Sequence, residues 1–195
     1  MGDVFANESE LDMTFNTEGT TADDLNSGGL VTKECHAHLL IANVKKEAKP
    51  GKVPCLVFDM QVLAADAEGQ KGKFIFHRIN LAKGNYTEGK DKKLIDLGPL
   101  TDGAMKSLLK FALGLQLITP EQIGTKDLRV PWSQAAGKQC MSHLRHGSEY
   151  TTDSGETKKG QIGIQFGEVY PVDDERVKDW PKDAEATSPT NLNDF

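Results

Sequence analysis

The chain has 195 residues, of which 37% are hydrophobic, and a net charge of −6, which suits one domain with polar ends. No apolar run approaches the roughly 18 residues of a membrane span, and the first residues lack the basic and apolar regions of a signal peptide. Three cysteines are too few, and odd in number, for a disulfide framework. We therefore expect a cytoplasmic protein with reduced thiols and no membrane partner.

The charge is distributed unevenly along the chain. Residues 1–28 contain seven acidic residues and no Lys or Arg, and residues 173–195 contain seven acidic and three basic residues. The middle, residues 29–172, contains 20 basic and 15 acidic residues and is therefore positive by 5. We predict a domain over 29–172 between a flexible acidic N-terminal arm and a flexible acidic C-terminal tail, because the ends cannot bury enough apolar area to order themselves. Alternatively, the ends only make an ordinary domain soluble.

Three strands are predicted in the first half of the domain. Residues 35–44 form a long apolar run that ends before a turn at 49–52, and residues 56–62 alternate with their large apolar side chains on one face. A polar loop at 66–72 leads to residues 74–81, which alternate again. This pattern predicts an antiparallel meander.

A helix follows the three strands. Residues 82–93 read as a loop rich in Gly and Lys, after which Thr101 can cap a helix that continues to about Leu115. Thr119 and Pro120 begin a second short helix in the same way, and residues 131–137 allow another helical turn.

Two more strands complete the predicted domain, at residues 139–144 and 161–169, with a polar hairpin loop at 146–159 between them. In the last strand Ile162, Ile164 and Phe166 share one face. Three strands, a helix and two strands are the order of the five-stranded OB barrel. The predicted fold class is therefore mainly β, an OB-fold with a helix between strands three and four.

The sequence contains none of the motifs that would indicate an enzyme. A phosphate-binding Gly-rich loop and a Gly-x-Ser-x-Gly elbow are both missing, and no carboxylate pair has a spacing that suits metal-dependent phosphodiester cleavage. We expect no catalytic residues and no cofactor.

Two groups of residues could in principle bind zinc, and they lie on the first and fourth predicted strands. Neighbouring residues of a strand point to opposite faces, so Cys35 and His36 cannot readily share one ion, and although His36 and His38 can, the spacing suits a tetrahedral site poorly. The leading interpretation therefore has no metal, and metal analysis would exclude the alternative of a zinc-dependent nucleic-acid module. The two groups are Cys35, His36 and His38, and Cys140, His143 and His146.

The third predicted strand has the clearest candidate site. Phe74, Phe76 and Arg78 share one face, and Ile75, His77, Ile79 and Leu81 share the other. If the aliphatic set lines the barrel, two rings and an arginine face outward. They then lie on the surface where OB barrels bind single-stranded nucleic acid. A base stacked on an aromatic ring contributes roughly 1–3 kcal/mol. The alternative is that Phe74 and Phe76 belong to the core.

Lysines are concentrated in the loops around this strand, where they could contact phosphates and make binding salt-dependent. Loop lysines are also common in any soluble protein. Tyr86 lies among them, and Trp132 is a further candidate for base stacking. The lysines are Lys45, Lys46, Lys49, Lys52, Lys71, Lys73, Lys83, Lys90, Lys92 and Lys93.

The C-terminus provides a candidate partner-binding element, Asp194 and Phe195. A tail of this kind can bind a basic pocket of a partner, or lie over its own basic groove. The ending resembles the acidic, Phe-terminated tip of bacterial and phage single-stranded DNA-binding proteins. Residues 69–81 and 167–174, with Trp180 and Pro181, are similar to phage and prophage proteins of OB type. The resemblance extends loosely over residues 30–181.

The resemblance implies a replication or recombination accessory protein that coats single strands in the cytoplasm of a bacterial host. The resulting hypothesis is sequence-tolerant single-stranded DNA binding, with a tail that recruits replication or recombination proteins and with possible assembly into a homo-oligomer. The alternative is an OB-type protein-interaction or scaffolding protein that does not bind nucleic acid. A salt titration separates the two, because phosphate binding weakens as salt rises.

Overall fold

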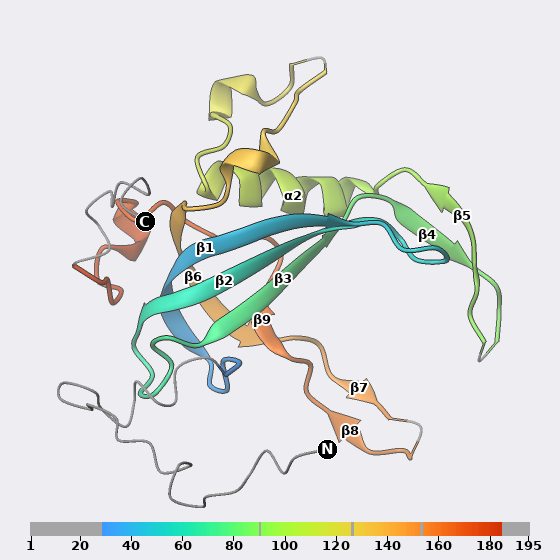
Figure 1. The fold of residues 1–195 in the computed structure, drawn as a ribbon, viewed down its shortest axis with the longest axis horizontal. Helices are drawn as coiled ribbons and strands as arrows, with labels where there is room; N and C mark the ends of the chain where they lie inside the picture. The colour runs from blue at the N-terminus through green and yellow to red at the C-terminus, as the bar shows by residue number, and fades with distance from the viewer. Residues whose placement is uncertain (1–28, 90, 126, 153, 185–195) are drawn as a thin grey trace, which may run out of the picture.

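The computed structural model describes residues 29–89, 91–125, 127–152 and 154–184. Its central element is a five-stranded antiparallel sheet in the order β3-β2-β1-β6-β9, which curls into a nearly closed barrel (Figure 1). The predicted mainly β fold with a five-stranded barrel is confirmed, and the architecture is compatible with an OB-like fold. The strands are β1 (Cys35–Glu47), β2 (Cys55–Ala65), β3 (Phe74–Asn80), β6 (Gln139–His146) and β9 (Ile162–Ile164).

Alternation along the strands determines which side chains fill the barrel. Leu39 lies opposite Val62 and Ile41 opposite Met60, and all four are almost fully buried. The pairing of β1 with β2 is irregular after His38 and again after Ile41. Such irregularities bend a strand, and here β1 pairs with β6 through its first half while it pairs with β2 along most of its length.

One helix, α2 (Asp102–Gly114), covers an open side of the barrel (Figure 1). Thr101 caps it as predicted, since its side chain accepts a hydrogen bond from the Ala104 N–H at 3.3 Å. Phe111 is fully buried and lies edge-on to Phe58 of β2, with the ring centroids 4.9 Å apart. Within the described residues no helix is long and apolar enough to cross a membrane. Two 3-10 turns follow, η2 (Pro120–Gln122) and η3 (Trp132–Gln134).

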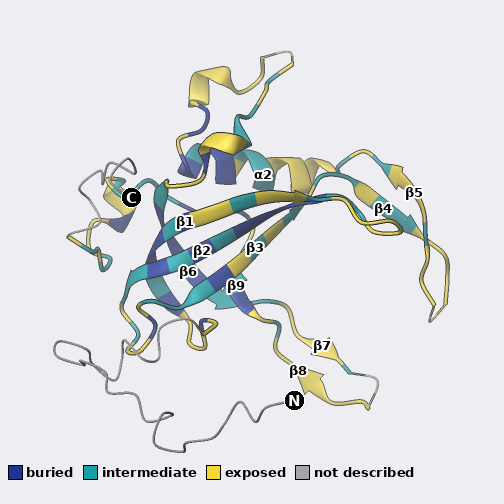
Figure 2. Ribbon diagram, viewed as in Figure 1, coloured by how far each residue is buried: buried dark blue, intermediate teal, exposed yellow. Residues whose placement is uncertain are grey.

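Two hairpins extend from the barrel and are mostly exposed (Figure 2). β4 (Lys83–Tyr86) pairs with β5 (Leu94–Gly98), so the segment 82–93 is not the simple loop that the sequence predicted. The polar loop at 146–159 contains the second hairpin, β7 (Tyr150–Thr151) with β8 (Thr157–Lys158).

The last predicted strand is wrong in its extent. β9 ends at Ile164, and Phe166 adopts a φ of +52° that no strand allows. Its side chain is 74% exposed, whereas Ile162 and Ile164 are buried in the barrel. The turn at Phe166 therefore directs this ring out of the face on which the alternation had placed it.

The folded part of the chain continues beyond Val172, where the sequence predicted that the domain would end. Tyr170 exchanges backbone hydrogen bonds with Met141 of β6, both at 2.8 Å. η4 (Glu175–Val177) follows, and Val177 is fully buried. Residues 170–184 therefore pack against the barrel, while residues 1–28 and 185–195 lie outside the described part of the chain.

Candidate nucleic-acid interface

The outer surface of β2 and β3, with the second half of β1, contains the predicted binding strand; we call this surface the open face. Ile75 is 2% exposed and points inward, whereas Phe76 is 56% exposed. Arg78 is also exposed, and Phe74 is half-buried. The predicted orientation of the strand is thus confirmed. The open face consists of Asn43, Lys45, Glu47, Cys55, Val57, Asp59, Gln61, Phe74, Phe76, Arg78 and Asn80, of which Cys55 and Val57 are buried.

Carboxylates neutralise part of the positive charge on the open face. Arg78 lies 3.3 Å from Glu47, and Lys49 lies 3.7 Å from the same carboxylate. One oxygen of Asp59, across the ladder from Phe76, lies 3.7 Å from the Lys45 Nζ. The other oxygen is buried and has no hydrogen-bond partner among the described residues. These acidic groups were not predicted from the sequence, because the register that brings them beside the cations is not visible in it.

The predicted lysines divide between two ends of the barrel. Lys52 and Lys83 belong to one end, where the β1–β2 loop meets the β4–β5 hairpin and a Cβ on Gly84 would lie 2.6 Å from Val53. Lys71 and Lys73 belong to the β2–β3 loop at the other end, where Lys71 pairs with Asp183 at 3.1 Å. The expectation that all of them surround one face is therefore wrong.

We call the first of these ends the lysine end. Several of its lysines form no ion pair within the described residues, so their charge is available to a ligand. Lys90 lies outside the described residues. The unpaired lysines of this end are Lys46, Lys52, Lys83, Lys92 and Lys93.

Tyr86 and Trp132, the other predicted stacking residues, have different surroundings. Tyr86 is 47% exposed on β4, at the lysine end. Trp132 is half-buried near α2, with its ring centroid 5.7 Å from that of Phe58 and 6.3 Å from that of Phe111. Tyr86 is therefore accessible at the lysine end, whereas Trp132 contributes to the margin of the core.

The outer surface of β1 and β6, which we call the covered face, lies beneath residues 170–184. The His36 ring lies between those of His143 and Trp180, with both centroid distances 4.3 Å. His38 is fully buried, and its Nδ1 accepts a hydrogen bond from the Asp183 N–H at 3.1 Å. Burial is the main cause that lowers the pKa of His38, so its ring is neutral and can accept this bond.

The cysteines and histidines considered as zinc ligands lie on different sides of the sheet. Cys35 and Cys140 belong to the core, where burial raises their thiol pKa values to about 11 and about 12. His36 and His143 lie on the outer surface. Among the described residues no group of three or more His, Cys, Asp or Glu could hold a metal ion.

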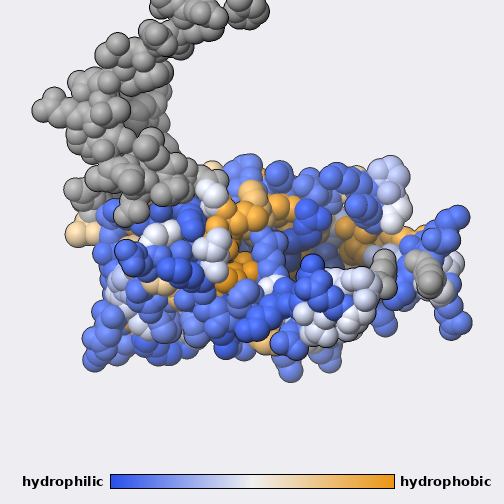
Figure 3. Space-filling model, turned by 90° about the horizontal axis from the view of Figure 1, so that it is seen from below, coloured by the Kyte–Doolittle hydropathy of each residue, from blue (hydrophilic) through white to orange (hydrophobic). Residues whose placement is uncertain are grey.

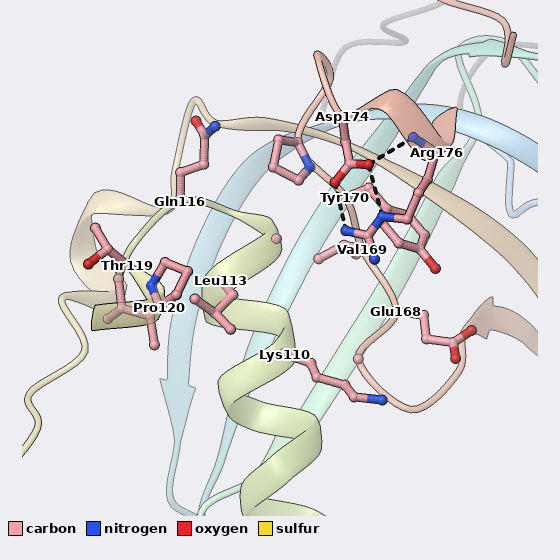
Figure 4. Close-up of a pocket in the computed structure, with 14 residues that line it drawn as sticks. Lys110, Leu113, Gln116, Thr119, Pro120, Glu168, Val169, Tyr170, Asp174 and Arg176 are labelled. Carbon is pink, nitrogen blue, oxygen red and sulfur yellow. Dashed lines mark hydrogen bonds and ion pairs between the residues drawn. The ribbon is translucent and has the colours of Figure 1, made fainter. Parts of the chain in front are cut away.

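A cavity of about 640 Å³ lies between α2 and the segment 167–176 (Figure 4). Leu113 and Lys110 approach it from α2, and Val169 and Tyr170 approach it from the opposite side. Arg176, at its rim, is held by two short hydrogen bonds to Asp174 and lies 4.5 Å over the Tyr170 ring. The walls of the cavity are largely apolar, and Lys110 lies at one edge.

Two exposed features were not predicted from the sequence: the β4–β5 hairpin and the outward ring of Phe166. The short runs of β4 and β5 are interrupted by Gly and Lys, which conceals their pairing. The Gly167 that follows Phe166 was the available signal for a turn.

Comparison of the chain with protein-family models and with curated proteins finds no match.

Proposed function

We propose that the protein binds single-stranded DNA with little sequence preference, in phage or prophage DNA replication or recombination, and catalyses no reaction. The observation that carries this proposal is the pair Phe76 and Arg78 on the open face, where the C-terminal segment does not cover them. An exposed ring can stack on any base, and a guanidinium beside it can contact the phosphate.

An OB-fold assignment forms part of the proposal. The strand order β3-β2-β1-β6-β9, with α2 between β3 and β6, is the order expected of an OB barrel. In that fold the outer face of the second and third strands and the first hairpin loop bind oligonucleotides. Here those elements are β2, β3 and the loop that contains Lys52, so the open face and the lysine end coincide with the expected surface.

The lysine end supports binding to a phosphate backbone. Lys83 follows the end of β3 closely, and the chain leads directly from Arg78 through Lys83 to the exposed Tyr86. A single DNA strand bound along this path would contact aromatic rings and positive charges in turn. Loss of condensed counterions would then make its affinity fall as salt rises.

The carboxylates of the open face do not prevent this binding. Glu47 and Asp59 form surface ion pairs with Arg78 and Lys45, and such pairs contribute only about 0–1 kcal/mol. A phosphate that replaces a carboxylate beside Arg78 therefore loses little.

The roles of the chain ends belong to this proposal as well. Asp194 and Phe195, which lie outside the described residues, would bind replication or recombination proteins. A cytoplasmic location and assembly into a homo-oligomer complete the hypothesis.

The test is a fluorescence anisotropy titration of labelled oligo(dT), compared with a duplex of the same length. We expect single strands to bind more tightly, with an affinity that falls between about 50 and 200 mM salt. Phe76→Ala should weaken oligo(dT) binding about 5- to 150-fold, because one stacked base contributes roughly 1–3 kcal/mol. Ile123→Ala is the control, since this apolar side chain is 40% exposed in the loop after η2, outside the proposed path. Equal loss in both variants, or no binding by the wild type, would contradict the proposal.

A protein-binding function is the second candidate, favoured by the apolar walls of the 640 Å³ cavity beside α2. In that case the protein binds a protein partner and does not bind DNA at any salt concentration. The salt titration separates the candidates, because only phosphate binding requires the affinity for oligo(dT) to depend steeply on salt.

A further inference from the structure

A groove of about 270 Å³ lies between β3 and α2, at the edge of β3 that faces away from β2. Ile79 and Leu108 provide apolar walls from the strand and the helix, and the ring of Phe166 lies at the groove. Its volume is just below the roughly 300–1,000 Å³ of pockets that hold whole ligands. It therefore suits one flat group rather than a whole small molecule.

The position of Phe166 is held by its neighbours and not by burial of its ring. The residue has a φ of +52°, which is unusual for a bulky side chain, and its side chain is 74% exposed. Gly167 follows with a φ of +69° and lies so close to α2 that a Cβ would overlap the Ser107 carbonyl oxygen. The turn is thus fixed against the helix, and it holds an aromatic ring in solvent beside an apolar groove. Strained residues of this kind concentrate at functional sites.

Polar groups at the groove add hydrogen-bonding capacity. Asn80 and Ser107 line it as neutral hydrogen-bonding groups, and Arg78 adds a positive charge to the lining. Burial lowers the pKa of His77 to about 4, so this lining residue is uncharged at neutral pH. An apolar groove with a flat ring and neutral hydrogen-bonding groups matches the chemistry of a nucleobase, which offers a π face and polar edges.

The groove is continuous with the open face. Arg78 lines the groove and also lies next to Phe76 on the outer side of β3. Two residues of a strand span about 7 Å, so a chain that passes Phe76 reaches the groove without leaving β3. Elsewhere on the molecule, the face seen from below also shows apolar atoms bordered by hydrophilic ones (Figure 3).

We propose that this groove holds one nucleobase of a bound single strand, stacked on Phe166, while Arg78 contacts the adjoining phosphate. The inference rests on the proposed function and extends it. It adds a base-binding position between β3 and α2 to the stacking site at Phe76.

The test compares Phe166→Ala, Phe166→Leu and Phe166→Tyr in anisotropy titrations with labelled oligo(dT) and with a labelled abasic strand of the same length. Phe166→Ala and Phe166→Leu should weaken oligo(dT) binding about 5- to 150-fold, because neither side chain provides a flat ring. Phe166→Tyr keeps the ring and should bind as the wild type does. All variants should bind the abasic strand equally, since it has no base to stack.

Three outcomes would overturn the inference. Wild-type binding of oligo(dT) that Phe166→Ala leaves unchanged removes the base site and leaves the proposed function intact. Equal loss on the abasic strand, or a lower melting temperature in Phe166→Ala, shows that the ring only supports the fold. Failure of the wild-type protein to bind any single strand overturns the proposed function itself, and the base site with it.

Discussion

The two outer faces of the barrel share strand β1, yet only one of them lies beneath the C-terminal segment. On the covered face, residues 170–184 place the Trp180 ring 4.3 Å from that of His36 and bury His38 completely. On the open face, Phe76 is 56% exposed, and no described segment lies over it. β1 contributes to both faces, with its first half beside β6 and its second half beside β2.

This difference separates structural aromatic residues from available ones. The chain uses its own C-terminal segment to shield the rings of one face, so those rings contribute to folding. On the open face the Phe76 ring remains exposed to solvent. Burial of such a side chain would have been favourable by roughly 1.5–3 kcal/mol. An exposed aromatic side chain beside cations is informative because it gains nothing for the folded monomer.

The largest expected effect concerns the stability that the two faces contribute. Trp180→Ala should lower the free energy of unfolding by about 3 kcal/mol, because it removes a ring packed on His36 and Tyr170. Phe76→Ala should change it by no more than about 0.5 kcal/mol, as expected of a surface position. Urea denaturation monitored by circular dichroism measures both values.

In DNA binding the order of the two variants should be reversed, with Phe76→Ala more affected than Trp180→Ala. Trp180→Ala, assayed at a temperature where it is folded, should bind oligo(dT) as the wild type does. If Phe76→Ala is the less stable protein, the open face is part of the packed structure and the contrast between the faces is lost.

Much of the barrel could be predicted because its strands have one buried and one solvated side. Leu56, Phe58 and Met60 alternate in the sequence and point into the core together. The same rule placed Ile75 inside and Phe76 outside. Thr101 marked the start of α2 because a cap is a local interaction.

The remaining features depend on contacts that a local pattern does not contain. Phe166 continues the alternation of Ile162 and Ile164, but the packing of Gly167 on α2 ends the strand first. The C-terminal segment is acidic and rich in turn-forming residues, yet Val177 is fully buried and Trp180 packs on His36 of the distant strand β1. Composition cannot reveal partners that lie about 140 residues away in the sequence.

The candidate site was predictable in part for the same reason. Phe76 and Arg78 follow from the period of one strand. The separation of Lys71 from Lys52 requires knowledge of which loops meet, and the ion pairs of Glu47 and Asp59 require the register of three strands.

A smaller effect is expected from acidification, which acts on a histidine in the core behind the open face. Burial lowers the pKa of His77 to about 4, whereas in the unfolded chain it is about 6.5. The unfolded chain therefore binds the proton first, and stability is complete above about pH 6.5 and declines as the pH falls toward 4. His77 alone should account for a loss of about 2 kcal/mol at pH 5.

The measurement is the free energy of unfolding at pH 7 and at pH 5 in the wild type and in His77→Gln. The difference between the two pH values should be about 2 kcal/mol smaller in the variant. The part that remains should include His38, whose neutral ring accepts the Asp183 N–H on the covered face. An unchanged pH dependence in His77→Gln would mean that this ring is already solvated in the folded protein.

The smallest effect distinguishes the two lysine-bearing ends of the barrel. Lys52→Ala with Lys83→Ala removes two unpaired charges from the lysine end, which adjoins the open face. Lys71→Ala with Lys73→Ala removes two charges from the opposite end, where Lys71 pairs with Asp183 and Lys73 donates to Thr32. Each single-strand phosphate that a lysine neutralises contributes about 0.7 to the slope of log affinity against log salt. The first variant should therefore reduce the slope for oligo(dT) by roughly 1 to 1.5, and the second should leave it unchanged. Equal reductions would show that the strand passes both ends of the barrel, and the path along β3 would then have to be redrawn toward the covered face.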